Sequence, residues 1–244
     1  MTGSLLFYTF MLLLLFFLIF IIRDDSISFL ENIYNLKGFI FLYLVLLLSS
    51  LYYFNLNDLS IKDSIYNSYG LHHFSKMTNY SSYFICNILH LDFFHLLLNL
   101  LFFYCLINLE EYYGWLFFLI FFIIPSLITS IILSYIIPVN LTGLGASNGL
   151  LSLFSILIAE NLVFDKLPFN IPYSNKIMDF VINIIILLFF VYILTYGYRP
   201  RTAHVSAYPF MAHSLGALTG FGLYCILKFL LPSLYDYIIK LGRT

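Results

Sequence analysis

Long apolar runs recur along this chain and constrain its fold more than any other feature of the sequence. A window of about 19 residues finds them at roughly 5–22, 38–56, 91–109, 115–137, 144–164, 178–197 and 209–231. An α-helix rises about 1.5 Å per residue, so most runs are long enough to cross about 30 Å of hydrocarbon. Lipid offers the backbone no hydrogen-bond partners, and a helix satisfies its own. The pattern therefore predicts an all-α polytopic membrane protein.

The composition agrees with this fold class and narrows the function. Of the 244 residues, 62% are hydrophobic and 9% are charged, whereas soluble domains average about 45–50% apolar and about 25% charged residues. The net charge of −1 gives no indication of a nucleic-acid partner. Three scattered cysteines, Cys86, Cys105 and Cys225, form no CxxC motif. We interpret them as packing residues rather than metal ligands or a disulfide framework.

The runs and the segments between them suggest a division of the chain. Residues 1–37 are expected to form an N-terminal transmembrane anchor with a connecting loop, and residues 232–244 a short C-terminal tail. The first run has no Lys or Arg before it and no small-x-small cleavage signal after it, so we expect an uncleaved anchor. The connection 57–90 is too long for a passive link, which favours interfacial helices or a functional loop.

Charges and sequons outside the runs indicate an orientation. Placing residues 23–37 in the cytosol gives that side a small excess of Lys and Arg. It also puts the two N-glycosylation sequons, at Asn79 and Asn140, on the opposite side. The N-terminus lacks the Arg-rich amphipathic pattern of a mitochondrial presequence. We expect an integral membrane protein of the secretory pathway or plasma membrane, and leave open which membrane it is.

The third run carries a polar face at its beginning. His95 and Asn99 are four residues apart, so on a helix they share one face. His90 and Asp92 precede them where the run begins and water is near. Taken alone, a membrane-embedded His or Asn is most often an interhelical hydrogen bond that holds a bundle together.

The fifth run opens with a small, polar segment around Ser147. Glycines at positions 143, 145 and 149 suit a tight turn into a helix and a close approach of backbone or substrate. A helix that begins near Ser147 would point unpaired N–H groups at whatever lies above the hydroxyl. The alternative interpretation of this motif is a packing patch with an N-capping serine.

The last run carries a histidine in register with two glycines. Gly216 and Gly220 form a GxxxG face that another helix can approach closely, and His213 lies one turn before Gly216. Acyl transfer needs a nucleophile, a base within hydrogen-bond reach and donors for the oxyanion. Ser147, His213 and the His95/Asn99 pair are of these types, and a Ser–His dyad is the simplest arrangement.

Together these motifs resemble those of the rhomboid intramembrane serine proteases. The family's GxSx, AHxxGxxxG and HxxxxHxxxN patterns correspond to the segments 145–148, 212–220 and 90–99, in the family's order and spacing. The resemblance spans about residues 38–231. It implies a six-helix rhomboid-like core, to which the run 5–22 adds one N-terminal helix. Glu110 and Gly114 resemble the structural ExxxG that follows the family's second helix.

The resemblance also implies a function and a set of site residues. Ser147 would be the nucleophile and His213 the general base, with His95, Asn99 and the Ser147 N–H as the oxyanion hole. The implied supporting residues are His90, Gly145, Asn148, Gly216 and Gly220. Single-pass transmembrane proteins would be the substrates, cut within the lipid bilayer near the top of their helix. No metal, organic cofactor or nucleic acid is implied. Family precedent makes the loop before the last helix a lid.

The chain departs from the family pattern at three places. Asn148 follows the serine where glycine is usual, Ser81-Ser82 stand where a Trp-Arg pair is expected, and Leu151 replaces an aromatic residue. These departures bear on cleavage efficiency and substrate choice. Two other functions stay open at this point: a catalytically inactive relative that binds membrane clients, and a small transporter that uses the histidines as a proton relay.

Overall fold

The structure of the chain is a computed structural model that describes residues 36–163 and 208–244, except 57, 78, 105 and 139–141. These residues form helices and one isolated β-bridge, Leu71 to Gly143. The α-helices are α3 (Lys37–Phe54), α4 (Leu59–Tyr69), α5 (Ser82–Ile85), α6 (Phe93–Tyr104), α7 (Ile107–Tyr113), α8 (Trp115–Ile136), α9 (Ser147–Val163), α11 (Tyr208–Cys225) and α12 (Pro232–Gly242). The 3₁₀-helix η1 (Phe74–Lys76) and the π-helix η3 (Ile226–Leu230) complete the set.

The all-helical fold predicted from the apolar runs is confirmed over these residues. Three helical stretches are long and apolar enough to cross a membrane, Lys37–Phe54, Trp115–Ile136 and Met211–Leu230. The apolar helices α6 and α9 have only 12 and 17 residues. The run 91–109 forms two helices, α6 and α7, where one was expected. The runs 5–22 and 178–197 lie outside the described residues.

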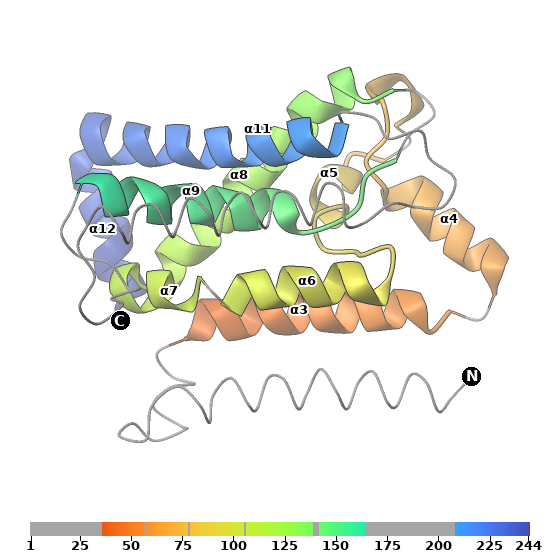
Figure 1. Cartoon of the computed structure of the whole chain (residues 1–244), viewed down its shortest axis with the longest axis horizontal. Helices are drawn as coiled ribbons and strands as arrows, with labels where there is room; N and C mark the ends of the chain where they lie inside the picture. The colour runs from red at the N-terminus through yellow and green to blue at the C-terminus, as the bar shows by residue number, and fades with distance from the viewer. Residues whose placement is uncertain (1–35, 57, 78, 105, 139–141, 164–207) are drawn as a thin grey trace.

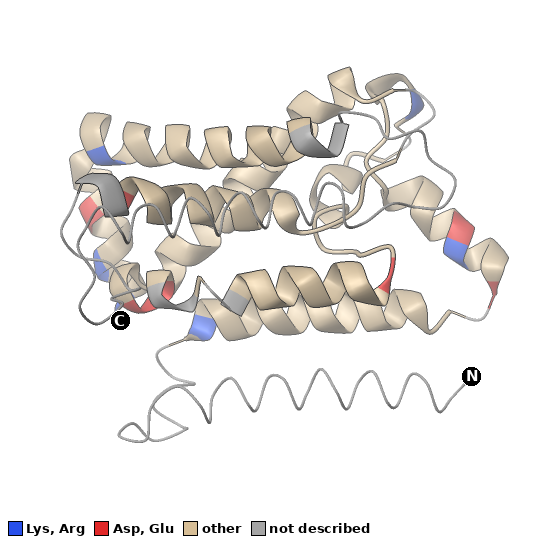
Figure 2. Ribbon diagram, in the orientation of Figure 1, with Lys and Arg blue, Asp and Glu red and all other residues tan. Residues whose placement is uncertain are grey.

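Charged residues gather at the two ends of the helix bundle. Figure 2 shows the described Lys, Arg, Asp and Glu residues near these ends, with a tan band between them. A charged side chain near the centre of a bilayer costs several kcal/mol, so this distribution fits helices that cross a membrane. The site motifs on α6, α9 and α11 all lie at the end where α4 and α5 are found (Figure 1).

The helix α9 packs between α8 and α11 because small residues let the backbones approach. A Cβ at Gly149 would lie 2.5 Å from the Ser126 hydroxyl of α8. On the other side, a Cβ at Gly220 would lie 2.2 Å from the hydroxyl of Ser152. In Figure 1, α9 and α11 run side by side along most of their length. The close packing expected of the GxxxG face is therefore present, with α9 as its partner.

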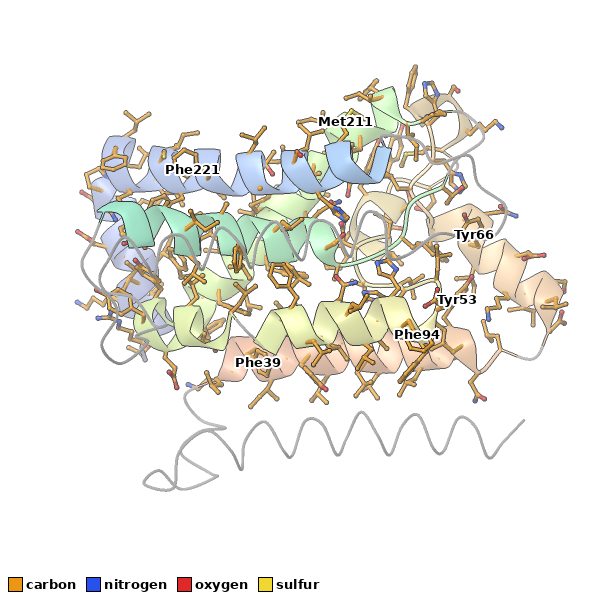
Figure 3. The ribbon with its side chains drawn as sticks, viewed as in Figure 1. Phe39, Tyr53, Tyr66, Phe94, Met211 and Phe221 are labelled. Carbon is orange, nitrogen blue, oxygen red and sulfur yellow. The ribbon has the colours of Figure 1, made fainter. Side chains whose placement is uncertain are left out.

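Aromatic side chains fill the space between α9 and the lower layer formed by α3 and α6 (Figure 3). The rings of Phe102 and Phe154 join α6 to α9 with 5.1 Å between centroids. The rings of Phe39 and Phe103 stack at 4.7 Å and join α3 to α6. Such pairs each contribute about 0.5–1.5 kcal/mol beyond the apolar area that they bury.

The carboxylate of Glu110 caps the beginning of α3. Its two oxygens accept hydrogen bonds from the backbone N–H groups of Gly38 at 2.7 Å and Phe39 at 2.5 Å. The first N–H groups of a helix have no partner within the helix, and a carboxylate also suits the positive end of the helix dipole. The residue resembling the ExxxG glutamate thus joins α7 to α3.

The C-terminal segment, treated above as a short tail, is helical. It forms α12, which packs against α8 near Gly114. Gly114 has φ +91°, and a Cβ there would lie 2.4 Å from the carbonyl carbon of Gly242. Glycine is required at this position both by the backbone conformation and by the contact.

The long connection expected to be structured contains α4, η1 and α5. Helix α4 has no buried residue, and the Asp58 side chain caps it by accepting hydrogen bonds from the Ser60 hydroxyl at 2.7 Å and the Ser60 N–H at 2.8 Å. These hydrogen bonds lower the pKa of Asp58 below its usual value. Further along, Leu71 and Gly143 exchange two backbone hydrogen bonds, which tie this connection to the loop before α9.

Two glycines of α11 offer a matched test of the packing. We expect Gly220→Ala to destabilise the protein by about 1–3 kcal/mol, because the new methyl group overlaps Ser152. Gly222→Ala should be neutral or stabilising, since nothing lies within 4 Å of its Cβ position and alanine favours a helix. Thermal unfolding in detergent measures both. Equal melting temperatures for the two variants would contradict the close approach of α9 and α11.

The cap on α3 makes a second prediction. Glu110→Gln keeps the size of the side chain but leaves one of the two N–H groups without a good acceptor. We expect a loss of about 1–3 kcal/mol in the free energy of unfolding. Asp236→Asn is the control, because Asp236 is an exposed residue of α12. A change no larger than that of the control would show that the cap contributes little.

Candidate active site

Ser147 and His213 are in hydrogen-bond contact. The His213 Nε2 atom lies 2.9 Å from the Ser147 hydroxyl, although the residues are 66 positions apart. Ser147 is the first residue of α9, and His213 lies in the second turn of α11. Met211, labelled in Figure 3, marks the end of α11 at which the histidine lies. Each of the two side chains is 7% exposed. The structure thus brings the nucleophile and base expected from the sequence within reach of each other.

A backbone hydrogen bond and a glycine hold the turn before Ser147. Gly145 has φ +137°, which favours glycine, and its N–H donates to the carbonyl of Cys86 at 2.8 Å. A Cβ at Gly145 would lie 2.5 Å from the ring of His95. Only glycine therefore lets this turn lie directly against the His95 imidazole, and Gly145 is two residues before Ser147.

His90 supports the same turn through a hydrogen bond to its backbone. The N–H of Ala146 donates to the His90 Nε2 atom at 3.4 Å, and the His90 Nδ1 atom lies 2.9 Å from the hydroxyl of Ser50 on α3. The rings of His90 and His95 meet edge to face at 5.1 Å. Ser50 lies 40 residues from His90, and no motif singled it out in the sequence.

Asn99 lies one turn beyond His95 on α6 and is fully buried. Its amide nitrogen donates to the carbonyl of His95 at 2.8 Å. Its amide oxygen accepts no hydrogen bond from the described residues. The N–H of His95 is itself bound by the Asp92 carboxylate at 2.9 Å, which caps α6. The face shared by His95 and Asn99, expected from their spacing, is present in α6.

The Asn148 side chain extends toward Asn87, which follows α5. Its Nδ2 atom lies 3.5 Å from the Asn87 Oδ1 atom. Asn87 in turn donates to the Ser130 hydroxyl at 2.8 Å. Asn87 and Ser130 were not expected at the site. Their only signal in the sequence was their polar character within or beside apolar segments.

Two carboxylates of the described helices, Glu110 and Glu160, have partners other than the Ser147–His213 pair. Glu110 caps α3, and Glu160 lies 2.7 Å from the ammonium of Lys228. Glu160 lies 13 residues after Ser147 on α9, which places it about 20 Å along the helix. Of the described histidines, cysteines, aspartates and glutamates, no group of three or more has the geometry to hold a metal ion.

Comparison with known proteins identifies the family. The chain matches the family description "Rhomboid domain" over residues 77–229, more than half of its length. This range contains every residue of the site from Asn87 to Gly220, while α3 and α4 precede it. No curated protein and no solved structure matches the chain. The resemblance based on the Ser147, His213 and His95 motifs is confirmed: the chain belongs to the rhomboid family.

Proposed function

We propose that this protein is an intramembrane serine endopeptidase that cleaves transmembrane segments of single-pass membrane proteins. The observation that carries the proposal is the 2.9 Å contact between the Ser147 hydroxyl and the His213 Nε2 atom. Rhomboid family membership supports the same chemistry, because proteins of this family are generally intramembrane serine proteases.

In this mechanism His213 first acts as general base. Its Nε2 atom takes the proton of the Ser147 hydroxyl while the Oγ atom attacks the scissile carbonyl. The same imidazole then gives that proton to the leaving amine, which releases one product and leaves an acyl group on Ser147. Water, deprotonated by His213, then attacks the acyl carbonyl; the acyl–Oγ bond breaks, His213 returns the proton to Ser147, and the second product leaves as a carboxylic acid. The proton transfers in these steps use the Ser147–His213 pair and require access of water.

The oxyanion of the tetrahedral intermediate would lie beside the first turn of α9. Helix α9 begins at Ser147, and the first N–H groups of a helix are not used within it. The His95 ring packs against Gly145 at the same place. The Asn99 amide uses one hydrogen on the carbonyl of His95, and its second hydrogen is the one that we assign to the oxyanion. Donors of this kind stabilise developing charge strongly in a site that excludes bulk water.

The position of the site among long apolar helices supports a substrate that also lies in the membrane. An intact substrate helix hides its carbonyl groups in internal hydrogen bonds, so cleavage requires a segment that unwinds. Small or helix-breaking residues near the end of a transmembrane helix meet this requirement.

Removal of either member of the pair should abolish cleavage. We expect Ser147→Ala and His213→Ala to reduce cleavage of a reporter transmembrane peptide by at least about 10³-fold, because both act in one proton transfer. Ser155→Ala, two turns further along α9, and His73→Ala, in the connection before α5, are matched controls that should cleave normally. The assay uses purified protein in detergent and product analysis by mass spectrometry.

The outcome also separates the alternatives. Cleavage that persists in both Ala variants would exclude the dyad. A wild-type protein that binds transmembrane peptides without cutting any of them would favour the client-binding function instead. Histidine-dependent proton flux in vesicles, without cleavage, would favour a transporter.

The oxyanion donors make a quantitative prediction. His95→Ala and Asn99→Ala should each lower kcat by about 10²–10³-fold and change KM little, because the oxyanion exists only in the transition state. Steady-state kinetics with a fluorogenic transmembrane substrate measures both constants. A loss below about threefold would make these residues packing contacts. His90→Ala should act mainly on stability, since His90 contacts Ser50 and the backbone of Ala146.

A further inference from the structure

The side chain of Asn148 is a buried amide directly beside the nucleophile. It is 8% exposed, and it occupies the second position of α9, immediately after Ser147. The rhomboid resemblance leads one to expect glycine here, which would leave this space empty. The amide therefore brings a polar group to the site that the family pattern does not supply.

Helix α11 packs against the backbone of Asn148 and holds it in place. A Cβ at Gly216 would lie 2.7 Å from the carbonyl oxygen of Asn148 and 2.9 Å from its Cα. The backbone of Asn148 is thus in direct contact with α11, and the side chain extends from α9 toward Asn87, which is itself bonded to Ser130 of α8. Its position relative to Ser147 is set by the helix.

Asn87 determines the orientation of the Asn148 amide. The Asn87 Nδ2 atom donates to the carbonyl of Tyr83 at 2.9 Å and to the Ser130 hydroxyl at 2.8 Å. These contacts leave the Asn87 Oδ1 atom as the acceptor for the Asn148 Nδ2 atom, at 3.5 Å. The Asn148 nitrogen is therefore directed toward Asn87, and its oxygen is directed away from Asn87.

The Asn148 oxygen is buried and accepts no hydrogen bond from any residue in the described part of the chain. A buried acceptor without a donor raises the free energy of the folded protein, and native structures contain few such groups. A ligand that supplies a donor removes this cost when it binds. An unwound substrate strand has such donors, because its backbone N–H groups have left their helical partners.

We propose that Asn148 is a substrate-binding residue whose amide oxygen accepts a hydrogen bond from the extended strand next to the scissile bond. The donor is a main-chain N–H or the hydroxyl of a Ser or Thr side chain. Asn87 positions the amide for this contact. That the bound strand is a substrate rests on the proposed function. The hydrogen bond itself can be measured as binding, without any cleavage.

The test measures binding to the Ser147→Ala protein in detergent micelles. The probe is a fluorescent reporter transmembrane peptide, and fluorescence anisotropy gives its Kd. In one series, each amide near the scissile bond is replaced in turn by an ester, which removes a single N–H. In the other series, Ser or Thr residues near this bond are replaced by Ala or Val. We expect one replacement to weaken binding about ten-fold, the usual effect of losing one buried hydrogen bond.

The same peptides are then measured with Asn148 changed. In Ser147→Ala/Asn148→Leu, which keeps the volume of the side chain without the oxygen, the sensitive replacement should alter Kd less than twofold. Asn148→Gly is the second variant, because glycine is the family's usual residue there. A sensitive ester would assign the donor to the main chain, and a sensitive hydroxyl would assign it to a side chain. Asn87→Ala should reduce the effect partially, since it removes the partner that orients the amide.

The contrary results are distinct from failure of the protease proposal. Replacements that weaken binding equally with and without the Asn148 oxygen would overturn the inference, as would peptides that do not bind at all. A wild-type protein that binds the peptides with this Asn148-dependent preference but does not cut them would overturn the protease function and leave the binding role intact.

Discussion

The close contact between α9 and α11 brings Ser147 and His213 together, and the rest of the candidate site depends on it. Gly216 and Gly220 bring the backbone of α11 against Asn148 and Ser152, which sets the 2.9 Å distance between His213 and Ser147. In lipid there is little hydrophobic force between helices, so small residues and van der Waals packing must hold them together. The GxxxG face therefore bears on the proposed chemistry, because it sets the register of His213 relative to Ser147.

The remaining supports reach the nucleophile through backbone groups of the turn before it. Cys86 accepts from Gly145, Leu71 pairs with Gly143, and His90 accepts from Ala146. All three belong to the connection between α3 and α6, which therefore acts as a structural platform for the turn. Groups held through their backbone stay in position when a substrate enters, and preorganisation of this kind is what electrostatic catalysis requires.

Some of this arrangement was accessible from the sequence. The GxSx and AHxxGxxxG motifs singled out Ser147 and His213, and the four-residue spacing put His95 and Asn99 on one face of α6. Helical periodicity relates residues that are close in the chain, so such local predictions are robust. The contacts of Asn148 with Asn87, and of His90 with Ser50, were not predictable. They join residues 61 and 40 positions apart, and no local pattern determines the register between separate helices.

By itself, the sequence determined the class of the protein and the polar side chains that its apolar helices carry. Apolar runs in lipid can form little but helices, and their polar residues are too costly to be incidental. Only the tertiary structure decided which groups meet: the glutamate that caps α3, the α8 serine behind the site, and the direction of the Asn148 amide. The physical reason is that burial constrains each helix separately, whereas contact geometry depends on how several helices pack at once.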